Sequence, residues 1–180
     1  MTPQHLHPRR KDRSKDEAWI RSFLRRGGAA VLATVRDGRP VPVPLNYVYD
    51  EGRNAVYVHT ALKGGTVGSL PGPAALAVFE MGRMLPADEA LEFGVEYRSV
   101  VVFGTGSVVE DPEEAEAALV LIMEKYAPHL KAGVDYRPVA PEEIRRTAVL
   151  RVDIEGWSGK EKAEAPDFPG AYRFEDVRGD

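Results

Sequence analysis

Residues 40–64 read PVPVPLNYVYDEGRNAVYVHTALKG and predict two β-strands joined by a tight turn. In the first strand the odd positions of residues 41–49 carry valine, leucine or tyrosine, and they face one side, whereas two prolines face the other. A proline inside a strand removes a ladder hydrogen bond, so this strand belongs at an edge, at a bulge or beside a ligand. The second strand, residues 55–60, ends at His59 and Thr60.

A loop rich in glycine and hydroxyl side chains follows the second strand. It contains Lys63, the Gly64-Gly65 pair, Thr66 and Ser69. Glycines let backbone N–H groups approach an anion closely, so such a loop can bind a phosphate. An ordinary turn is the alternative, and the loop by itself does not decide between them.

Composition narrows the class of protein. The 180 residues are 43% hydrophobic and 29% charged, as expected for one globular domain with its own core. The formal net charge of -4 gives no general argument for a nucleic-acid or membrane partner. Cysteine is absent, which excludes disulfides and thiolate chemistry, and no apolar run approaches the roughly 20 residues of a membrane span. A cytoplasmic protein is the expectation.

The remaining segments predict a mainly β fold. A basic N-terminal arm (residues 1–13) precedes a helix that starts at Ser14, and a late helix starts at Asp111-Pro112. The tail, residues 164–180, looks irregular. Besides the opening pair, strands are expected at residues 29–35, 74–81, 95–110 and 147–154, with a polar excursion at 82–93. The first three strands have no helical crossovers, so we expect a closed antiparallel barrel of six strands with attached helices in residues 14–163.

Familiar catalytic motifs are missing. The sequence has neither an HExxH metal motif, nor a GxSxG nucleophile turn, nor a Walker-type phosphate loop. Of the four histidines, only His59 lies where a site is expected. A histidine at the end of a strand is more often a surface or packing residue than a catalyst. Residue patterns alone therefore lead to a small barrel with a possible anion-binding loop.

Four short motifs, in order and with matching spacing, resemble a known family. They are Asp12-Arg13, the segment from Leu32 to His59, the segment YRSVVVFG at 97–104, and WSGK at 157–160. Together they resemble the pyridoxamine-5′-phosphate oxidase-like superfamily of flavin-binding split barrels, and within it the Nim-type nitroimidazole-resistance branch. The resemblance extends to about residue 162.

The resemblance implies a six-stranded split barrel that binds FMN in a groove between the two subunits of a homodimer. The residues expected to line the flavin are Pro44, Leu45, Asn46, Tyr47, His59, Thr60, Ala61, Ser99 and Trp157, the last with its WSGK segment reaching over from the partner subunit. A cationic Lys160 or Arg98 near the pyrimidine end would favour the anionic reduced flavin. His59 is the expected catalytic residue, because its ordinary pKa near 6.5 suits proton donation.

The phosphate loop departs from the family pattern. Many relatives carry a basic pair where this chain has Gly65-Thr66. Lys63, Thr66 and Ser69 remain to hold the phosphate, and the loss of one charged contact weakens binding by about 10- to 100-fold.

The sequence leaves three functions open. The first is an FMN-dependent reductase of small electron-poor compounds such as nitroimidazoles, using NAD(P)H or a redox partner. The second is a non-catalytic flavin- or haem-binding protein for storage or sensing, which the altered phosphate loop favours. The third is a nucleic-acid-associated regulator acting through the basic arm, although no aromatic residues are interleaved there. We expect a homodimer with a small-molecule substrate, and neither nucleic acid nor membrane as a partner.

Overall fold

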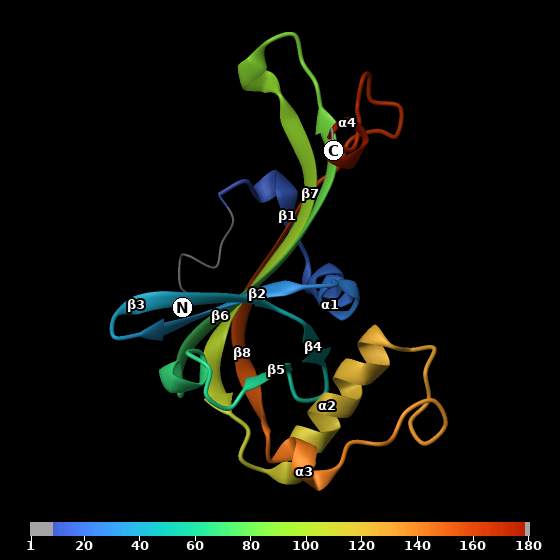
Figure 1. Cartoon of the computed structure of the whole chain (residues 1–180). Coiled ribbons are helices and arrows are strands. Elements are labelled where there is room, and N and C mark those ends of the chain that lie inside the picture. The colour runs from blue at the N-terminus through green and yellow to red at the C-terminus, as the bar shows by residue number, and fades with distance from the viewer. Residues whose placement is uncertain (1–8, 179–180) are drawn as a thin grey trace.

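A computed structural model of the chain describes residues 9–178 (Figure 1). The basic arm expected at residues 1–13 therefore lies largely outside the described residues. The elements are η2 (Lys11–Arg13), β1 (Ser14–Lys15), α1 (Glu17–Arg26), β2 (Ala30–Arg36), β3 (Arg39–Leu45), β4 (Tyr47–Asp50), β5 (Ala55–Ala61), η3 (Val67–Ser69), β6 (Gly72–Leu85), η4 (Ala90–Glu92), β7 (Gly94–Val108), α2 (Pro112–Tyr126), α3 (Pro141–Ile144), β8 (Thr147–Lys162) and α4 (Phe174–Val177).

In the described part of the chain the strands form one antiparallel sheet of eight strands, in the order β3-β2-β6-β7-β8-β5-β4, with β1 added to β8. The expected mainly β, split-barrel class is confirmed. Two details differ, because the sheet has eight strands rather than six and its ladder is not closed. β3 and β4 end the path on opposite sides, yet only Asn46 separates them in the chain. The sheet must therefore curl until its two ends meet at Asn46, so the barrel is joined there by the chain itself.

Alternating side chains divide the core into two clusters. Inside the curled sheet, apolar residues such as Leu76 and Val100 pack against one face of α1, which contributes Ile20, Phe23 and Leu24. α2 covers the opposite face of β5 and β8 and forms the second cluster (Val48, Ala55, Tyr57, Ala115, Ala118, Ile122 and Val149). Full burial of a side chain of leucine or valine size stabilises the fold by about 1.5–3 kcal/mol, so these clusters supply most of the driving force for folding.

Both main helices have acidic N-caps. Asp111 caps α2 as expected, and its side chain accepts a hydrogen bond from the N–H of Glu113. The expected start of α1 at Ser14 is wrong, because Asp16 is the cap and accepts from the N–H of Trp19 at 2.9 Å. Ser14 instead pairs with Lys160 in the β1–β8 ladder, and a residue paired in a strand cannot begin a helix.

Strands β6, β7 and β8 continue beyond the barrel as a projecting arm (Figure 1). The expected excursion at 82–93 is therefore too long, since β6 runs to Leu85 and β7 begins at Gly94. β8 also extends past the expected Ile154, through Lys162. The C-terminal segment then returns along the arm, and Tyr172 exchanges two backbone hydrogen bonds with Met84. No helix within residues 9–178 is long and apolar enough to cross a membrane.

Candidate functional site

One face of the sheet, turned away from the barrel core, gathers predicted site residues from three strands. The register places Pro44, Val31, Ala77, Val101 and Ser158 in one row across five strands. The next row along the arm contains Phe79, Ser99 and Lys160. Directly paired residues share a face, so we define the outer face by these rows and the neighbouring one (Pro42, Ala33, Ala75, Phe103 and Gly156).

The outer face is a shallow apolar shelf with polar groups at its arm end. Its central residues are mostly alanine and valine and are half-exposed, while Phe79 is 68% exposed. The hydroxyls of Ser99 and Ser158 and the ammonium of Lys160 have no hydrogen-bond or ion-pair partner in the described part of the chain. A flat apolar surface bordered by free donors suits a planar ring with polar edges.

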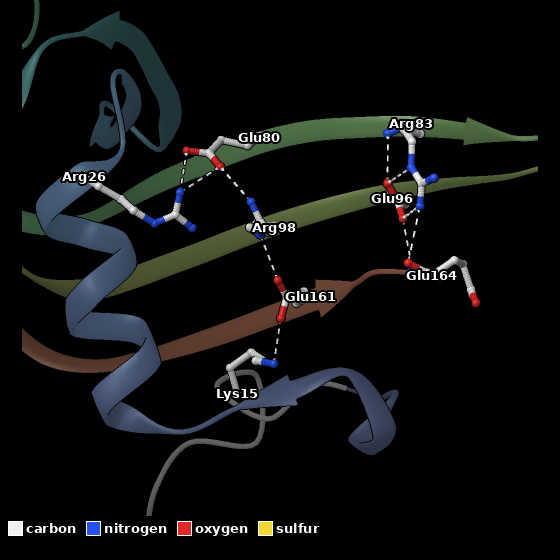
Figure 2. A network of polar contacts seen from close by, with 8 residues as sticks. All are labelled: Lys15, Arg26, Glu80, Arg83, Glu96, Arg98, Glu161 and Glu164. Atoms are coloured by element: carbon white, nitrogen blue, oxygen red, sulfur yellow. Dashed lines mark hydrogen bonds and ion pairs between the residues drawn. The ribbon is translucent and has the colours of Figure 1, made fainter. Parts of the chain in front are cut away.

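Two other predicted residues face the opposite way. Trp157 packs against the core cluster, and the guanidinium of Arg21 lies 4.8 Å from its ring centre. Arg98 donates to Glu161 at 2.8 Å and lies near Glu80, within a chain of ion pairs that runs from Lys15 to Arg26 (Figure 2). The structure therefore does not bring the side chains of Trp157 and Arg98 together with Ser99 and Lys160.

Side chains of α2 fix the backbone at the break between β3 and β4. Leu45 packs on the core, Asn46 is exposed, and Tyr47 is fully buried, with its hydroxyl donating to the carbonyl of Leu24 at 2.8 Å. Of these residues, only Asn46 offers its side chain to a ligand. The backbone N–H of Tyr47 donates to the hydroxyl of Tyr126 at 3.1 Å, and its carbonyl accepts from Lys125 at 3.0 Å.

Lys125 and Tyr126 were not anticipated from the sequence, where they are the last residues of an ordinary amphipathic helix. Burial lowers the pKa of Lys125 to about 8. The ring of Tyr47, with its centre 3.5 Å from the ammonium, opposes this shift because it favours the charged form. These two α2 side chains fix the backbone on which Asn46 is presented.

His59, Thr60 and Ala61 end β5 at the far side of the barrel. His59 is exposed and lies on the face that carries Tyr57, whereas Thr60 lies on the inner face with Val58. His59 pairs with Val149 of β8, and roughly eleven residues of that strand, about 36 Å when extended, separate it from Lys160. A single chain therefore does not bring His59 and Lys160 together.

In the loop after β5, some of the polar groups expected to bind a phosphate form hydrogen bonds within the protein instead. The hydroxyl of Ser69 donates at 2.6 Å to the carbonyl of Thr66 and lies 2.7 Å from the hydroxyl of Thr34, and both loop residues are buried. The side chain of Lys63 is exposed. Among residues 9–178 no acceptor is found for the backbone N–H groups of Gly65 and Thr66, and Gly65 is exposed, so its N–H is available to an anion.

Arg36 supplies a cation at this loop that sequence reasoning missed. A Cβ placed on Gly68 would lie 3.4 Å from its Nη1, so the guanidinium rests against the loop backbone. Its acidic neighbour, Asp37, is 3.8 Å away and almost fully exposed. The signal in the sequence was the pair of arginines flanking the Asp37-Gly38 turn, since Arg36 and Arg39 pair directly across it.

The site residues thus form two groups within one chain. Arg36, Lys63 and Gly68 define the loop end, and Ser99 with Lys160 defines the arm end. On the strand register, Arg36 is level with the start of β6 and Lys160 with Phe79, which places them roughly 25 Å apart. No cluster of three or more histidine, aspartate or glutamate side chains suited to a metal occurs in the described residues.

Comparison with known proteins gives a family and a fold. The family model described as pyridoxamine 5′-phosphate oxidase matches residues 16–161. No curated protein sequence matches the chain. A flavocytochrome from Azotobacter vinelandii superposes with a TM-score of 0.79 at 22% identity, over 91% of this chain and 76% of that chain.

Two further solved structures have the same fold. The FAD and heme binding protein from Mycobacterium smegmatis gives a TM-score of 0.76 at 24% identity, over 87% of this chain and 76% of its own. A protein from Bacteroides thetaiotaomicron, described as a candidate 5-nitroimidazole antibiotic resistance protein, gives 0.65 at 22% identity, over 82% and 84%. At these identities the likeness establishes the fold alone.

Proposed function

This chain belongs to the pyridoxamine 5′-phosphate oxidase family, and from that premise we propose that it is a flavin-binding oxidoreductase that reduces small electron-poor compounds. The observation that carries the proposal is the register that aligns Ser99 and Lys160 with an apolar shelf. We further propose FMN as the flavin. Electrons come from NAD(P)H or from a redox partner, and 5-nitroimidazoles are the substrate class, which the description of one structural neighbour suggests.

The chemistry of the available groups fits a flavin phosphate and ring. At the loop end, the cations of Arg36 and Lys63 and the exposed N–H of Gly65, which has no acceptor among residues 9–178, match the charge and hydrogen-bonding needs of a phosphate. A Cβ at Gly65 would meet nothing within 4 Å, so the loop is open to an approaching group. At the outer face, small side chains leave room for a planar ring.

A homodimer completes the proposed site. The loop end and the arm end of one chain are too far apart to hold one FMN, so we place Lys160 of one subunit against the flavin whose phosphate the partner binds. Phe79, which is 68% exposed on the arm, favours burial against a second copy. The same contact would cover the apolar shelf.

Each residue then has a defined role. A bound flavin supplies the capacity to accept and deliver a hydride. Lys160 neutralises negative charge at the ring edge, and Ser99 donates a hydrogen bond there. Arg36 and Lys63 hold the phosphate. His59, exposed at the end of β5, orients substrate or donates a proton.

Absorbance and flavin titration test the cofactor first. The purified protein should show flavin absorbance, and release followed by chromatography separates FMN from FAD. The variant Lys160→Met should weaken flavin binding about 10- to 100-fold, while the exposed Arg145→Met serves as a matched control. A protein that neither contains nor binds flavin would refute the proposal.

Turnover is tested separately. With flavin bound, NAD(P)H-dependent loss of a 5-nitroimidazole should be measurable, and His59→Ala should lower turnover while leaving flavin affinity unchanged. Equal turnover in the variant would remove His59 from the catalytic role.

A non-catalytic flavin- or haem-binding protein is the second candidate. It is favoured by the two neighbours whose descriptions include a haem protein, both with higher TM-scores than the resistance protein. Titration with haem distinguishes this candidate from the reductase. A shift of the haem Soret band on binding to the protein, without any nitroimidazole turnover, would support the non-catalytic candidate.

A further inference from the structure

A cavity of about 440 Å³ lies on the arm, next to the returning C-terminal segment. Neither Ser99 nor Lys160 lines it, but Met81, Tyr97 and Lys162 form the next row of the outer face along the arm. Its walls come from all three arm strands and from the chain beyond β8. The lining residues are Glu80, Met81, Gly82, Arg83, Glu96, Tyr97, Arg98, Lys162, Ala163 and Arg173.

Hydrogen bonds fix the walls of this cavity. Arg83 pairs with Glu96 through two of its nitrogens, at 2.9 and 2.7 Å. The same guanidinium donates to the carbonyls of Pro166 at 2.8 Å and Ala165 at 2.9 Å. The N–H of Glu164 donates to Glu96 at 2.8 Å (Figure 2). Arg83 and Glu96 together fasten the C-terminal segment to the arm, so the hollow is a built feature of the fold.

The charge inside the cavity is unbalanced. Four cations line it against two carboxylates. Both carboxylates are already committed, Glu96 to Arg83 and Glu80 to Arg26 at 3.1 Å. Lys162 and Arg173 have no ion-pair partner among residues 9–178. Two unpaired cations facing one hollow attract a dianion, because such a ligand neutralises both at once.

The cavity also offers apolar surface beside these cations. Tyr97 and Met81 pair directly across β6 and β7, so their side chains share a face. Gly94 keeps space open for the ammonium of Lys162, because a Cβ at that position would collide with it. A ligand with a compact apolar body and a doubly charged head fits this combination.

We propose that the cavity binds a small phosphate monoester, with the phosphate drawn to Lys162 and Arg173 and the organic body against Tyr97 and Met81. A phosphate monoester carries close to two negative charges at neutral pH, which matches the two unpaired cations. The site is independent of the proposed flavin site and does not require that proposal to hold.

Phenyl phosphate is the probe, titrated into full-length protein and followed by amide chemical shifts. The expected shifts cluster at residues 80–83, 96–98 and 162–163, inorganic phosphate binds more weakly, and phenol binds least. Lys162→Met and Arg173→Met should each weaken phenyl phosphate about tenfold or more. Lys162→Arg should restore binding, and the control Arg145→Met, exposed and away from the cavity, should leave it unchanged.

Competition with FMN separates this site from the flavin site. If the cavity is a distinct site, phenyl phosphate binds equally well to flavin-free and flavin-saturated protein. Displacement by FMN with loss of the same shifts would overturn the assignment, since the cavity would then belong to the flavin. Equal affinity of wild type and Lys162→Met, with matching circular dichroism, would also overturn it.

Discussion

Replacing Arg36 in one copy of the chain and Lys160 in another tests whether a single flavin site takes residues from two subunits. Within one chain these residues lie roughly 25 Å apart on the sheet register, because Arg36 is level with the start of β6 and Lys160 with Phe79 near its middle. The substitutions Arg36→Met and Lys160→Met each remove one charged contact with the flavin. Each variant homodimer should therefore bind FMN about 10- to 100-fold more weakly, a loss of about 1.5–3 kcal/mol of binding free energy.

In mixed dimers, the fraction of sites that keep wild-type affinity for FMN decides between the two arrangements. In a two-fold dimer, one site of the mixed species combines Arg36 of one chain with Lys160 of the other, so it is unaltered. The second site carries both substitutions. Mixed dimers purified through two different affinity tags should therefore bind about half of the wild-type amount of FMN with wild-type affinity.

The assay is fluorescence quenching of FMN at a concentration between the dissociation constants of wild type and variants. If each site were built within one chain, both sites of the mixed dimer would carry one substitution. No high-affinity fraction would then appear, and the two-subunit site would be refuted. A mixed dimer of Arg36→Met with Arg145→Met provides the control for tagging and exchange. It keeps one unaltered flavin site whether each site is built within one chain or from two.

Three further substitutions test the fold that carries the site. Tyr126→Phe removes the hydroxyl that accepts from the N–H of Tyr47 and should cost about 1–2 kcal/mol of unfolding free energy in urea, whereas an unchanged midpoint would contradict that role. Gly104→Ala should cost at least about 2 kcal/mol in the same assay, because its Cβ would collide with a backbone carbonyl of β8; a loss within 0.5 kcal/mol, roughly the range of neutral surface changes, would show that the bulge absorbs it. Hydrogen bonding from Arg83 lowers the pKa of Glu96 from 4.5 to about 2, so its stabilisation is complete above about pH 4.5 and is lost as the pH falls toward 2. Glu96→Gln should therefore be about 1–2 kcal/mol less stable than wild type at pH 7 and nearly equal to it at pH 2, and a difference that does not change with pH would contradict this.

The barrel strands were predictable because their signals are local. Alternation in residues 41–49 identified the buried side, and Asp37-Gly38 identified the hairpin turn, where both residues have the positive φ that such a turn requires. The break at Asn46 was not predictable in the same way. It depends on which strands pair with β3 and β4, and pairing between distant segments leaves little trace in a single sequence.

The arm and the candidate site show the same contrast between local signals, which can be read from the sequence, and long-range contacts, which cannot. The last strand was expected to end at Ile154, yet β8 continues through Lys162 because a bulge opposite Gly104 absorbs the irregular register. Ser99 and Lys160 were anticipated from the family resemblance, and the register pairs them. Arg36 was missed because its closeness to Gly68 arises only when β2 and the loop after β5 fold against each other.

The prolines of β3 have a consequence for how copies of this chain can associate. Pro40, Pro42 and Pro44 occupy alternate positions, and within residues 9–178 β3 pairs only with β2. Alternate residues direct their N–H groups to the same side, so all three prolines leave the unpaired edge short of donors while the β2 ladder stays complete. A foreign strand therefore finds carbonyl acceptors but no N–H donors at these three positions, which guards this edge against continuous sheet growth and aggregation. A second copy must approach through side-chain packing on a face, and that is the approach that keeps an assembly finite.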